Sequence, residues 1–218
     1  MEGPKYRTGI RVLIADDHAI LRRGLRQIIE ETEDLRVVGE AESSAETIHY
    51  IRNNACDVVL LDISMPDRNG MDTLEIIAKD HPKVAVLMLS THPENQYAVR
   101  ALRGGASGYL TKQSAPAQLV NAIRRVATGK KYVTPGVAEE LARHVLNDSD
   151  RAPHEALSNR EYQTMCMIAG GSTVSEIAVQ LSLSVKTVSV YRARVLAKLG
   201  VTSNAGIAHY AIKNQLVE

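Results

Sequence analysis

The feature that most constrains the fold is the alternation of short apolar runs with amphipathic stretches over residues 1–130. The apolar runs occupy residues 10–15, 36–41, 58–61, 84–89 and 108–111. The segments between and after them carry apolar residues at helical spacing, and these segments are 18–31, 44–54, 71–80, 94–103 and 116–128. Such alternation of strand and helix predicts a parallel sheet with helices on both faces.

Polar and charged residues stand where several of the predicted strands end. The first strand leads into Asp16 and Asp17, the third ends on Asp62, and the fourth ends on Ser90. Lys112 follows the fifth strand. Because the carboxyl ends of parallel strands share one edge of the sheet, where ligand sites form, we expect three carboxylates, a hydroxyl and an ammonium to converge there.

This set of side chains predicts a particular chemistry. Carboxylates that lie close together repel one another, whereas a hard divalent cation such as Mg²⁺ takes oxygen ligands and relieves the repulsion. The ammonium and the hydroxyl suit phosphoryl oxygens, so we expect phosphoryl transfer to a carboxylate. Each residue alone has a plainer interpretation, as a solvated strand end or a surface charge, and His18 is expected to start a helix in a structural role. A phosphohydrolase with Asp62 as nucleophile is a rival, but the D-x-D pattern common in such enzymes has Ser64 at its second acidic position.

The motifs "IADDH", "LLDISMPDRNG", "VLMLS" and "GYLTK" resemble the receiver domain of two-component response regulators over about residues 10–128. The resemblance implies a flavodoxin-like, doubly wound sheet of five parallel strands in the order 2-1-3-4-5. The resemblance also implies that Asp62 is the phosphoacceptor and that Mg²⁺ is bound by Asp16, Asp17, Asp62 and the Ser64 backbone carbonyl. Ser90 and Lys112 would contact the phosphoryl group, and Tyr109 would be a switch that moves with Ser90. Many receivers have proline after this lysine, but here the residue is Gln113, and we expect a trans bond because a non-proline cis bond costs ~2.5–4 kcal/mol.

The pattern changes after Gly129. One helical stretch at 137–146 and a polar segment at 147–156 indicate a linker. Four short helices are then expected. Two of them start with a capping box, in which the first residue and the residue three positions later each bind the backbone N–H of the other through their side chains. The start signals are Ser158 with Glu161, Thr173 with Glu176, Ser184, and Ser203. The predicted division is a receiver at 8–130, a linker with a short helix at 131–152, and a small all-α helix-turn-helix domain at 153–218.

The stretch 184–200 is predicted to be a recognition helix. Val188, Val195 and Leu199 share its core face, and small side chains occupy the opposite face. An ordinary solvated face is the plain alternative, but the preceding helix and the turn "LSLS" complete a helix-turn-helix. Residues 153–218 closely resemble the LuxR-type DNA-binding domain, which implies base-facing and phosphate-binding residues: Ser189, Val190 and Ala193 for bases, and Lys186, Thr187, Arg194 and Lys198 for phosphates. Arg192 is expected to pair with Glu176 instead.

Both halves together resemble a response regulator of the NarL/FixJ family. This implies a sensor histidine kinase as phosphodonor, double-stranded promoter DNA as ligand, a homodimer, and a possible contact with RNA polymerase, without enzymatic turnover. A regulator that binds DNA without phosphorylation is the alternative. The net charge of +1 gives no whole-chain field toward nucleic acid or membranes, although residues 153–218 carry six Lys and Arg against four Asp and Glu. No apolar stretch approaches the ~20 residues of a membrane span. Two distant cysteines, Cys56 and Cys166, indicate small buried residues in a reducing cytoplasm.

Overall fold

The computed structural model describes residues 9–91, 94–146 and 152–217. The chain divides into two compact units: residues up to Glu94 and Arg100–Thr134 form the first, and Asn95–Val99 with the chain from Pro135 onward form the second. The predicted domain limits at residues 8 and 218, and residues 147–151 of the predicted linker, lie outside the described residues. No described helix combines the length and the apolar character that crossing a membrane requires.

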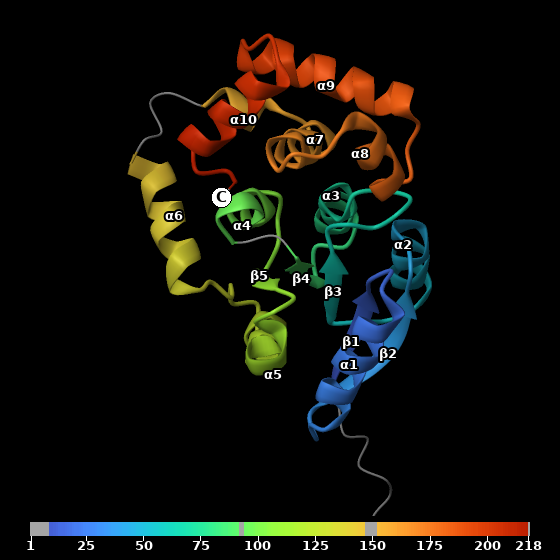
Figure 1. Ribbon diagram of the computed structural model, residues 1–218. Helices are drawn as coiled ribbons and strands as arrows, with labels where there is room; N and C mark the ends of the chain where they lie inside the picture. The colour runs from blue at the N-terminus through green and yellow to red at the C-terminus, as the bar shows by residue number, and fades with distance from the viewer. Residues whose placement is uncertain (1–8, 92–93, 147–151, 218) are drawn as a thin grey trace, which may run out of the picture. The chain divides into compact units, whose positions relative to one another are not determined.

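The first unit is built on a sheet of five parallel strands (Figure 1). The strands are β1 (Ile10–Ala15), β2 (Leu35–Ala41), β3 (Val58–Asp62), β4 (Ala85–Ser90) and β5 (Gly108–Thr111). The helices are α1 (Ala19–Glu30), α2 (Ser44–Asn53), α3 (Gly70–Asp80), α4 (Glu94–Arg103) and α5 (Ala115–Ala127). The strand order is β2-β1-β3-β4-β5, which confirms the predicted doubly wound, flavodoxin-like fold.

The sheet is covered on both faces. Helices α1 and α5 lie on one face, and α2 and α3 lie on the other (Figure 1). On the α1 and α5 side, Val12, Leu60 and Leu89 pack with Leu25 and Ile123 in one apolar core. Because successive side chains of a strand point to opposite faces, the alternate residues of the same strands fill the other side. Every residue of β3 is therefore buried, as its uninterrupted apolar run predicts.

The predicted linker starts as part of the first unit. Tyr132 forms a parallel bridge with Gly108, its N–H donates to the Ser107 carbonyl at 2.8 Å, and its hydroxyl donates to Gln118 Oε1 at 2.9 Å. Its ring packs against the core beneath α1 and α5. The helix expected at 137–146 is present as α6 (Pro135–Leu146).

The second unit contains the four predicted short helices. They are α7 (Asn159–Ala169), α8 (Val174–Gln180), α9 (Val185–Leu199) and α10 (Asn204–Lys213), preceded by a 3-10 turn, η1 (Pro153–Ala156). Both predicted capping boxes are formed, and the side chains of Ser184 and Ser203 cap α9 and α10. Helix α9 ends at Gly200, whose φ of 68° is a left-handed conformation that glycine adopts without strain.

Candidate acidic site and nucleic-acid interface

The carboxyl edge of the receiver sheet brings Asp16, Asp62 and Lys112 together. Lys112 Nζ lies 2.7 Å from Asp16 Oδ2 and 2.8 Å from Asp62 Oδ2, so one ammonium bridges the ends of β1 and β3. Both carboxylates are buried, and the Lys112 side chain is only slightly exposed. The convergence of these three residues, which come from the ends of β1, β3 and β5, is as the sequence predicts.

Asp62 has one oxygen without a partner. Oδ2 accepts the Lys112 ammonium, whereas Oδ1 is buried and forms no hydrogen bond with any residue that the structure describes. Burial and the neighbouring Asp16 carboxylate raise the pKa of Asp62, and Lys112 and the Ser64 main-chain N–H only partly oppose them. The two carboxylates in turn outweigh burial and raise the pKa of Lys112, which keeps it a cation. The site thus holds a buried carboxylate with a raised pKa, one oxygen of which accepts no hydrogen bond from a described residue.

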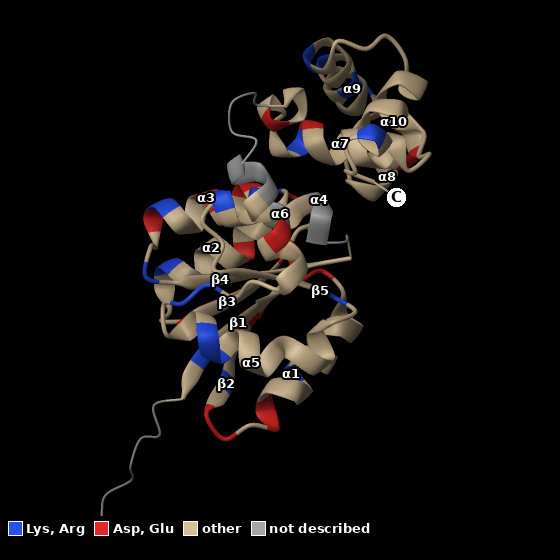
Figure 2. Ribbon diagram, turned by 90° about the vertical axis from the view of Figure 1, so that its left-hand side faces the viewer, with Lys and Arg blue, Asp and Glu red and all other residues tan. Residues whose placement is uncertain are grey.

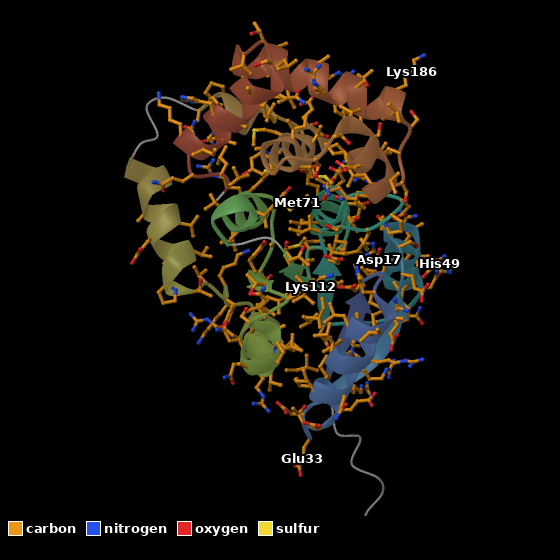
Figure 3. The ribbon with its side chains drawn as sticks, in the orientation of Figure 1. Asp17, Glu33, His49, Met71, Lys112 and Lys186 are labelled. Carbon is orange, nitrogen blue, oxygen red and sulfur yellow. The ribbon has the colours of Figure 1, made fainter. Side chains whose placement is uncertain are left out.

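Asp17 and His18 complete an acidic cluster with Asp16 and Asp62, whose ligand atoms all lie within 4.8 Å of one another. His18 precedes α1 as predicted, but its side chain does not cap the helix. Its Nδ1 lies 2.7 Å from Asp17 Oδ1 and 3.1 Å from Asp16 Oδ1. Oxygen donors of this kind fit a hard divalent cation, which would also satisfy the buried oxygen of Asp62. Figure 3 labels Asp17 and Lys112 beside the strands of this unit.

Ser90 and Tyr109 lie on the two strands beyond β3. Ser90 is buried at the end of β4, where its carbonyl accepts the Lys112 N–H at 2.7 Å. Tyr109 is buried in β5 beside Met88 of β4. Leu89 and Leu110 face the α1 and α5 core, so by alternation Ser90 and Tyr109 share the opposite face of the sheet. The structure therefore places both residues of the predicted switch on one face.

The loop between β3 and α3 is held in its middle and at its end. It includes half-buried Ser64, and the Asp67 carboxylate accepts the N–H groups of Ser44 and Ala45 at the start of α2, at 2.9 Å each. Gly70 closes the loop, because its N–H donates to the Ile63 carbonyl and a Cβ there would lie 1.9 Å from the Asp62 carbonyl oxygen. Only glycine allows this approach. The described residues contain no cis peptide bond, so the bond after Lys112 is trans as expected.

The recognition helix has the two faces that its sequence predicts. Val188, Val195 and Leu199 are buried, whereas the opposite face is exposed, including Val190 at 43%. Lys186, Ser189, Ala193 and Arg194 are exposed as well, and Thr187 is half-buried with its hydroxyl 2.8 Å from Ser184 Oγ. Lys186 and Arg194 form no ion pair with any described residue. Figure 2 shows basic segments along α9, and Figure 3 shows Lys186 pointing outward near its start.

Two cations of α9 have partners that the sequence did not predict. Lys198, expected on a DNA phosphate, instead pairs with Glu161 of α7 at 2.6 Å and donates to the Ala156 carbonyl at 3.0 Å. The predicted pairing of Arg192 with Glu176 is wrong. Arg192 Nε donates to Asn204 Oδ1 at 2.6 Å, and the Glu176 carboxylate is occupied by the capping box of α8. Both partners lie on other helices, which helical periodicity within one segment cannot reveal.

Three further residues at the acidic site escaped the sequence reasoning: His18 as a neighbour of the acids, Gly70, and Arg22. The Arg22 guanidinium is buried and donates to the Asp16 backbone carbonyl at 2.7 Å. A signal for it was present, since Arg22 lies at helical spacing from Leu25 and Ile29 on the stripe of α1 that faces the core. A cation on such a stripe needs a buried partner.

Comparisons with known proteins agree with this geometry. The family model of the response regulator receiver domain matches residues 12–124, and that of the luxR family of bacterial regulatory proteins matches residues 155–211. The chain is 39% identical over 208 residues to the response regulator UvrY of Escherichia coli (strain K12), covering 95% of each chain. It is 36% identical over 210 residues to the response regulator GacA of Pseudomonas viridiflava, covering 96% of this chain and 98% of GacA.

Solved structures of RcsB from Salmonella are similar over nearly the whole chain. One, from Salmonella enterica serovar Typhimurium with promoter DNA and the phosphomimetic BeF₃⁻, has a TM-score of 0.64 at 27% identity and covers 93% of this chain and 98% of RcsB. Another has a TM-score of 0.67 at 28% identity and covers 95% and 98%. The protein therefore belongs to the NarL/FixJ family of two-component response regulators, in which a receiver domain is joined to a LuxR-type helix-turn-helix DNA-binding domain.

Proposed function

We propose that Asp62 accepts a phosphoryl group from a sensor histidine kinase in a Mg²⁺-dependent reaction, and that phosphorylation favours a homodimer that binds promoter DNA. The observation that carries this proposal is the state of the Asp62 carboxylate. It is 1% exposed at the carboxyl edge of the sheet, with Lys112 on one oxygen and no described partner on the other. A group held this way is arranged for a further interaction at Oδ1.

In the proposed reaction, Asp62 Oδ1 attacks the phosphorus of a phosphohistidine. A P–O bond forms as the P–N bond breaks, and the electron pair of that bond remains on the imidazole of the kinase. Lys112 and Ser90 would contact the phosphoryl oxygens and neutralise their charge. When bound, Mg²⁺ would supply further positive charge for those oxygens, and Asp16, Asp17, Asp62 and the Ser64 backbone carbonyl would hold it.

The DNA half of the proposal rests on α9. Its exposed face offers Ser189, Val190 and Ala193 to the bases of a major groove, with Lys186, Thr187 and Arg194 for flanking phosphates. RcsB has been solved with promoter DNA and a phosphomimetic, and as two dimers on two parallel DNAs, which supports the same partners here. We place the receiver at 8–130, the linker at 131–152 and the DNA-binding domain at 153–218, and propose that the protein acts in the cytoplasm, where RNA polymerase is a possible further partner.

The test uses a matched pair of carboxylates on one strand. Asp62 ends β3, whereas Asp57 precedes the same strand at the opposite edge, where Arg11 binds it through its main-chain N–H and two guanidinium nitrogens. Incubation with Mg²⁺ and a small-molecule phosphodonor should add the mass of one phosphoryl group to the wild type and to Asp57→Asn, and none to Asp62→Asn. Undiminished labelling of Asp62→Asn, or labelling of all three without Mg²⁺, would contradict the assignment.

Two other functions are separated by simple measurements. A regulator that ignores phosphorylation would shift promoter DNA equally in gels with and without the phosphodonor. A phosphohydrolase would turn over small phosphate esters many times per molecule, whereas the proposed phosphoacceptor consumes one donor per modified site. The residue two positions after Asp62 is Ser64 rather than an acid, so the chain lacks the general acid that such turnover commonly uses at that place.

A further inference from the structure

The strongest unassigned feature near the site is a buried cation, Arg22, in the first turns of α1. Its side chain is 6% exposed, and three of its atoms bind three different groups. Nη1 donates to the Asp16 backbone carbonyl at 2.7 Å, and Nε donates to Glu40 Oε2 at 3.2 Å. Nη2 pairs with Glu42, which follows β2. Helix α1 lies beside β2 (Figure 1), so Arg22 connects the ends of two neighbouring strands.

A buried guanidinium is costly to maintain, because a charge that loses its hydration must recover the free energy from partners. The planar fork of arginine supplies five N–H donors in a fixed geometry, which suits a carbonyl and two carboxylates at once. A fully apolar residue would fill the same place on the stripe of α1 at less cost. An apolar residue could make none of these three contacts, and the one among them that reaches the acidic site is the contact to the Asp16 carbonyl.

The Asp16 carbonyl lies directly after β1, at the start of the acidic site. The Asp16 N–H donates to the Ala41 carbonyl at 3.1 Å, and the Asp16 carbonyl is held by Arg22. Both polar groups of the Asp16 main chain are therefore fixed to the β2 side of the sheet. The Asp16 carboxylate oxygen Oδ2 lies 2.7 Å from Lys112 Nζ, and Asp17 is the next residue of the chain.

We propose that Arg22 is a positioning residue for the divalent-cation site: by holding the main chain at Asp16, it orients the carboxylates of Asp16 and Asp17 toward the cation. The inference rests on the proposed Mg²⁺-dependent function. Arg22 acts through the main chain and does not itself contact the cation. Groups that orient metal ligands without binding the metal commonly set its affinity.

The same helix provides a matched control. Arg26 lies one turn further along α1 and shares a partner with Arg22, since its Nε donates to Glu40 Oε1 at 2.7 Å. Its other partner is Glu30, at 2.8 Å, and it does not contact the Asp16 carbonyl. Replacing Arg26 therefore removes a cation and a contact with Glu40 while the anchor of Asp16 stays.

The experiment measures binding of Mn²⁺, detected by electron paramagnetic resonance, with Mg²⁺ as competitor, to the full-length wild type and to Arg22→Met, Arg22→Lys and Arg26→Met. Thermal unfolding of each variant identifies the temperature range in which it is folded, and binding is measured within that range. We expect Arg22→Met to weaken Mn²⁺ binding about 10- to 100-fold, the usual effect of losing a group that orients a metal ligand. Arg22→Lys, with one ammonium in place of the fork, should fall between, and Arg26→Met should bind as the wild type does.

The outcomes separate this inference from the proposed function. If the wild type binds Mn²⁺ and both Arg22 variants bind it equally well, the positioning role is overturned and the metal site stands. An equal loss in Arg26→Met would also overturn it, because the effect would then follow from charge on α1 rather than from the anchor. If Arg22→Met does not fold, Arg22→Lys decides in the same way. A wild type that binds neither Mn²⁺ nor Mg²⁺ would overturn the Mg²⁺ site itself.

Discussion

Lys198 Nζ lies 2.6 Å from Glu161 Oε2, and this ion pair joins the recognition helix α9 to the capped start of α7. The Glu161 side chain is 3% exposed, whereas that of Lys198 is 39% exposed. The same Glu161 oxygen accepts the Ser158 N–H at 2.8 Å in the capping box. The Glu161 carboxylate thus completes the capping box of α7 and also binds α9, the helix that is proposed to lie in the major groove of DNA.

Lys198→Met should destabilise the second unit. Removing the cation leaves the buried Glu161 carboxylate without its ion-pair partner. Breaking a fully buried ion pair in this way costs about 3–5 kcal/mol. The loss expected here is smaller, on the order of 1–2 kcal/mol, because Lys198 is partly exposed to solvent. Lys198 lowers the pKa of Glu161 against the effect of burial. The pair therefore stabilises the wild type above the unfolded pKa of glutamate, about 4.3, and this contribution is lost as the pH falls through the lower folded value.

Urea unfolding followed by circular dichroism at pH 7 and at pH values below 4 measures this effect. The difference between wild type and Lys198→Met should shrink in acid. Lys186→Met is the control, since Lys186 is exposed on the same helix without an ion pair to a described residue, and it should change the free energy of unfolding little at either pH. Equal stability of Lys198→Met and wild type at pH 7 would show that the pair contributes nothing.

Asp62→Asn should be more stable than the wild type at neutral pH. Burial and Asp16 raise the pKa of Asp62, so its favourable contribution is present at low pH and is lost as the pH rises through the folded pKa. Asparagine does not titrate, and its advantage should therefore grow from acid toward pH 7. Thermal unfolding at a series of pH values without divalent cations measures it.

Asp57→Asn should show the opposite trend in the same measurement. Arg11 lowers the pKa of Asp57, so this carboxylate stabilises the fold above its unfolded pKa and loses that contribution as the pH falls. The variant should be less stable than the wild type at pH 7 and approach it in acid. Two variants that change stability in the same direction would contradict the opposite electrostatic environments of the two edges.

Gly70→Ala should damage the phosphoacceptor loop. The added Cβ would lie 1.9 Å from the Asp62 carbonyl oxygen, so the loop after β3 must move, and we expect a loss of more than ~2 kcal/mol in the free energy of unfolding with slower labelling at Asp62. Gly24→Ala is the control, because Gly24 is exposed in α1 with no neighbouring atom within 4 Å of a Cβ. It should stabilise the fold by about 0.5–1 kcal/mol, the usual gain of alanine over glycine in a helix. Denaturant unfolding compares the two, and equal effects would refute the close contact at Gly70.

Phosphorylation should shift the equilibrium between monomer and dimer. Ser90 and Tyr109 share one face of the sheet, so a phosphoryl group that contacts Ser90 is expected to repack that face, with a coupling free energy of about 1–3 kcal/mol. Sedimentation with and without the phosphodonor measures the dimerisation constant. Ser90→Ala should still be labelled at Asp62 but show a smaller shift, and an unchanged association state of the phosphorylated wild type would contradict the coupling.

DNA binding should separate base contacts from phosphate contacts on α9. Val190→Ala should relax the preference at one base pair, since its branched side chain suits a thymine methyl group, and leave nonspecific binding nearly unchanged. Arg194→Ala should weaken specific and scrambled duplexes alike and make the salt dependence shallower by about one charge. Because Lys198 is paired with Glu161, Lys198→Met should change the salt slope less than Arg194→Ala does. A salt titration on both duplexes tests this, and an unchanged slope with lost preference in Arg194→Ala would mean that the two faces are assigned the wrong way round.

The sequence by itself determined the receiver fold and the residues at its edge. Strand and helix periods are local properties, so the bounds of β1 (Ile10–Ala15) and β5 (Gly108–Thr111) agree with the apolar runs. Parallel strands place their carboxyl ends on one edge, which is why Asp16, Asp62 and Lys112 could be predicted to meet. The caps of the second unit were equally predictable, because each joins residues three positions apart.

Only the tertiary structure decided which charged groups bind one another. Lys198 meets Glu161 across 37 positions of the chain, and Arg11 meets Asp57 across 46, because helices and strands that are distant in sequence pack together. Arg22 meets Glu40 across 18 positions for the same reason, since α1 packs beside β2. Local periodicity states which face of an element is buried. The partner of a buried charge depends on the relative placement of separate elements, and in a folded chain that placement is set by packing.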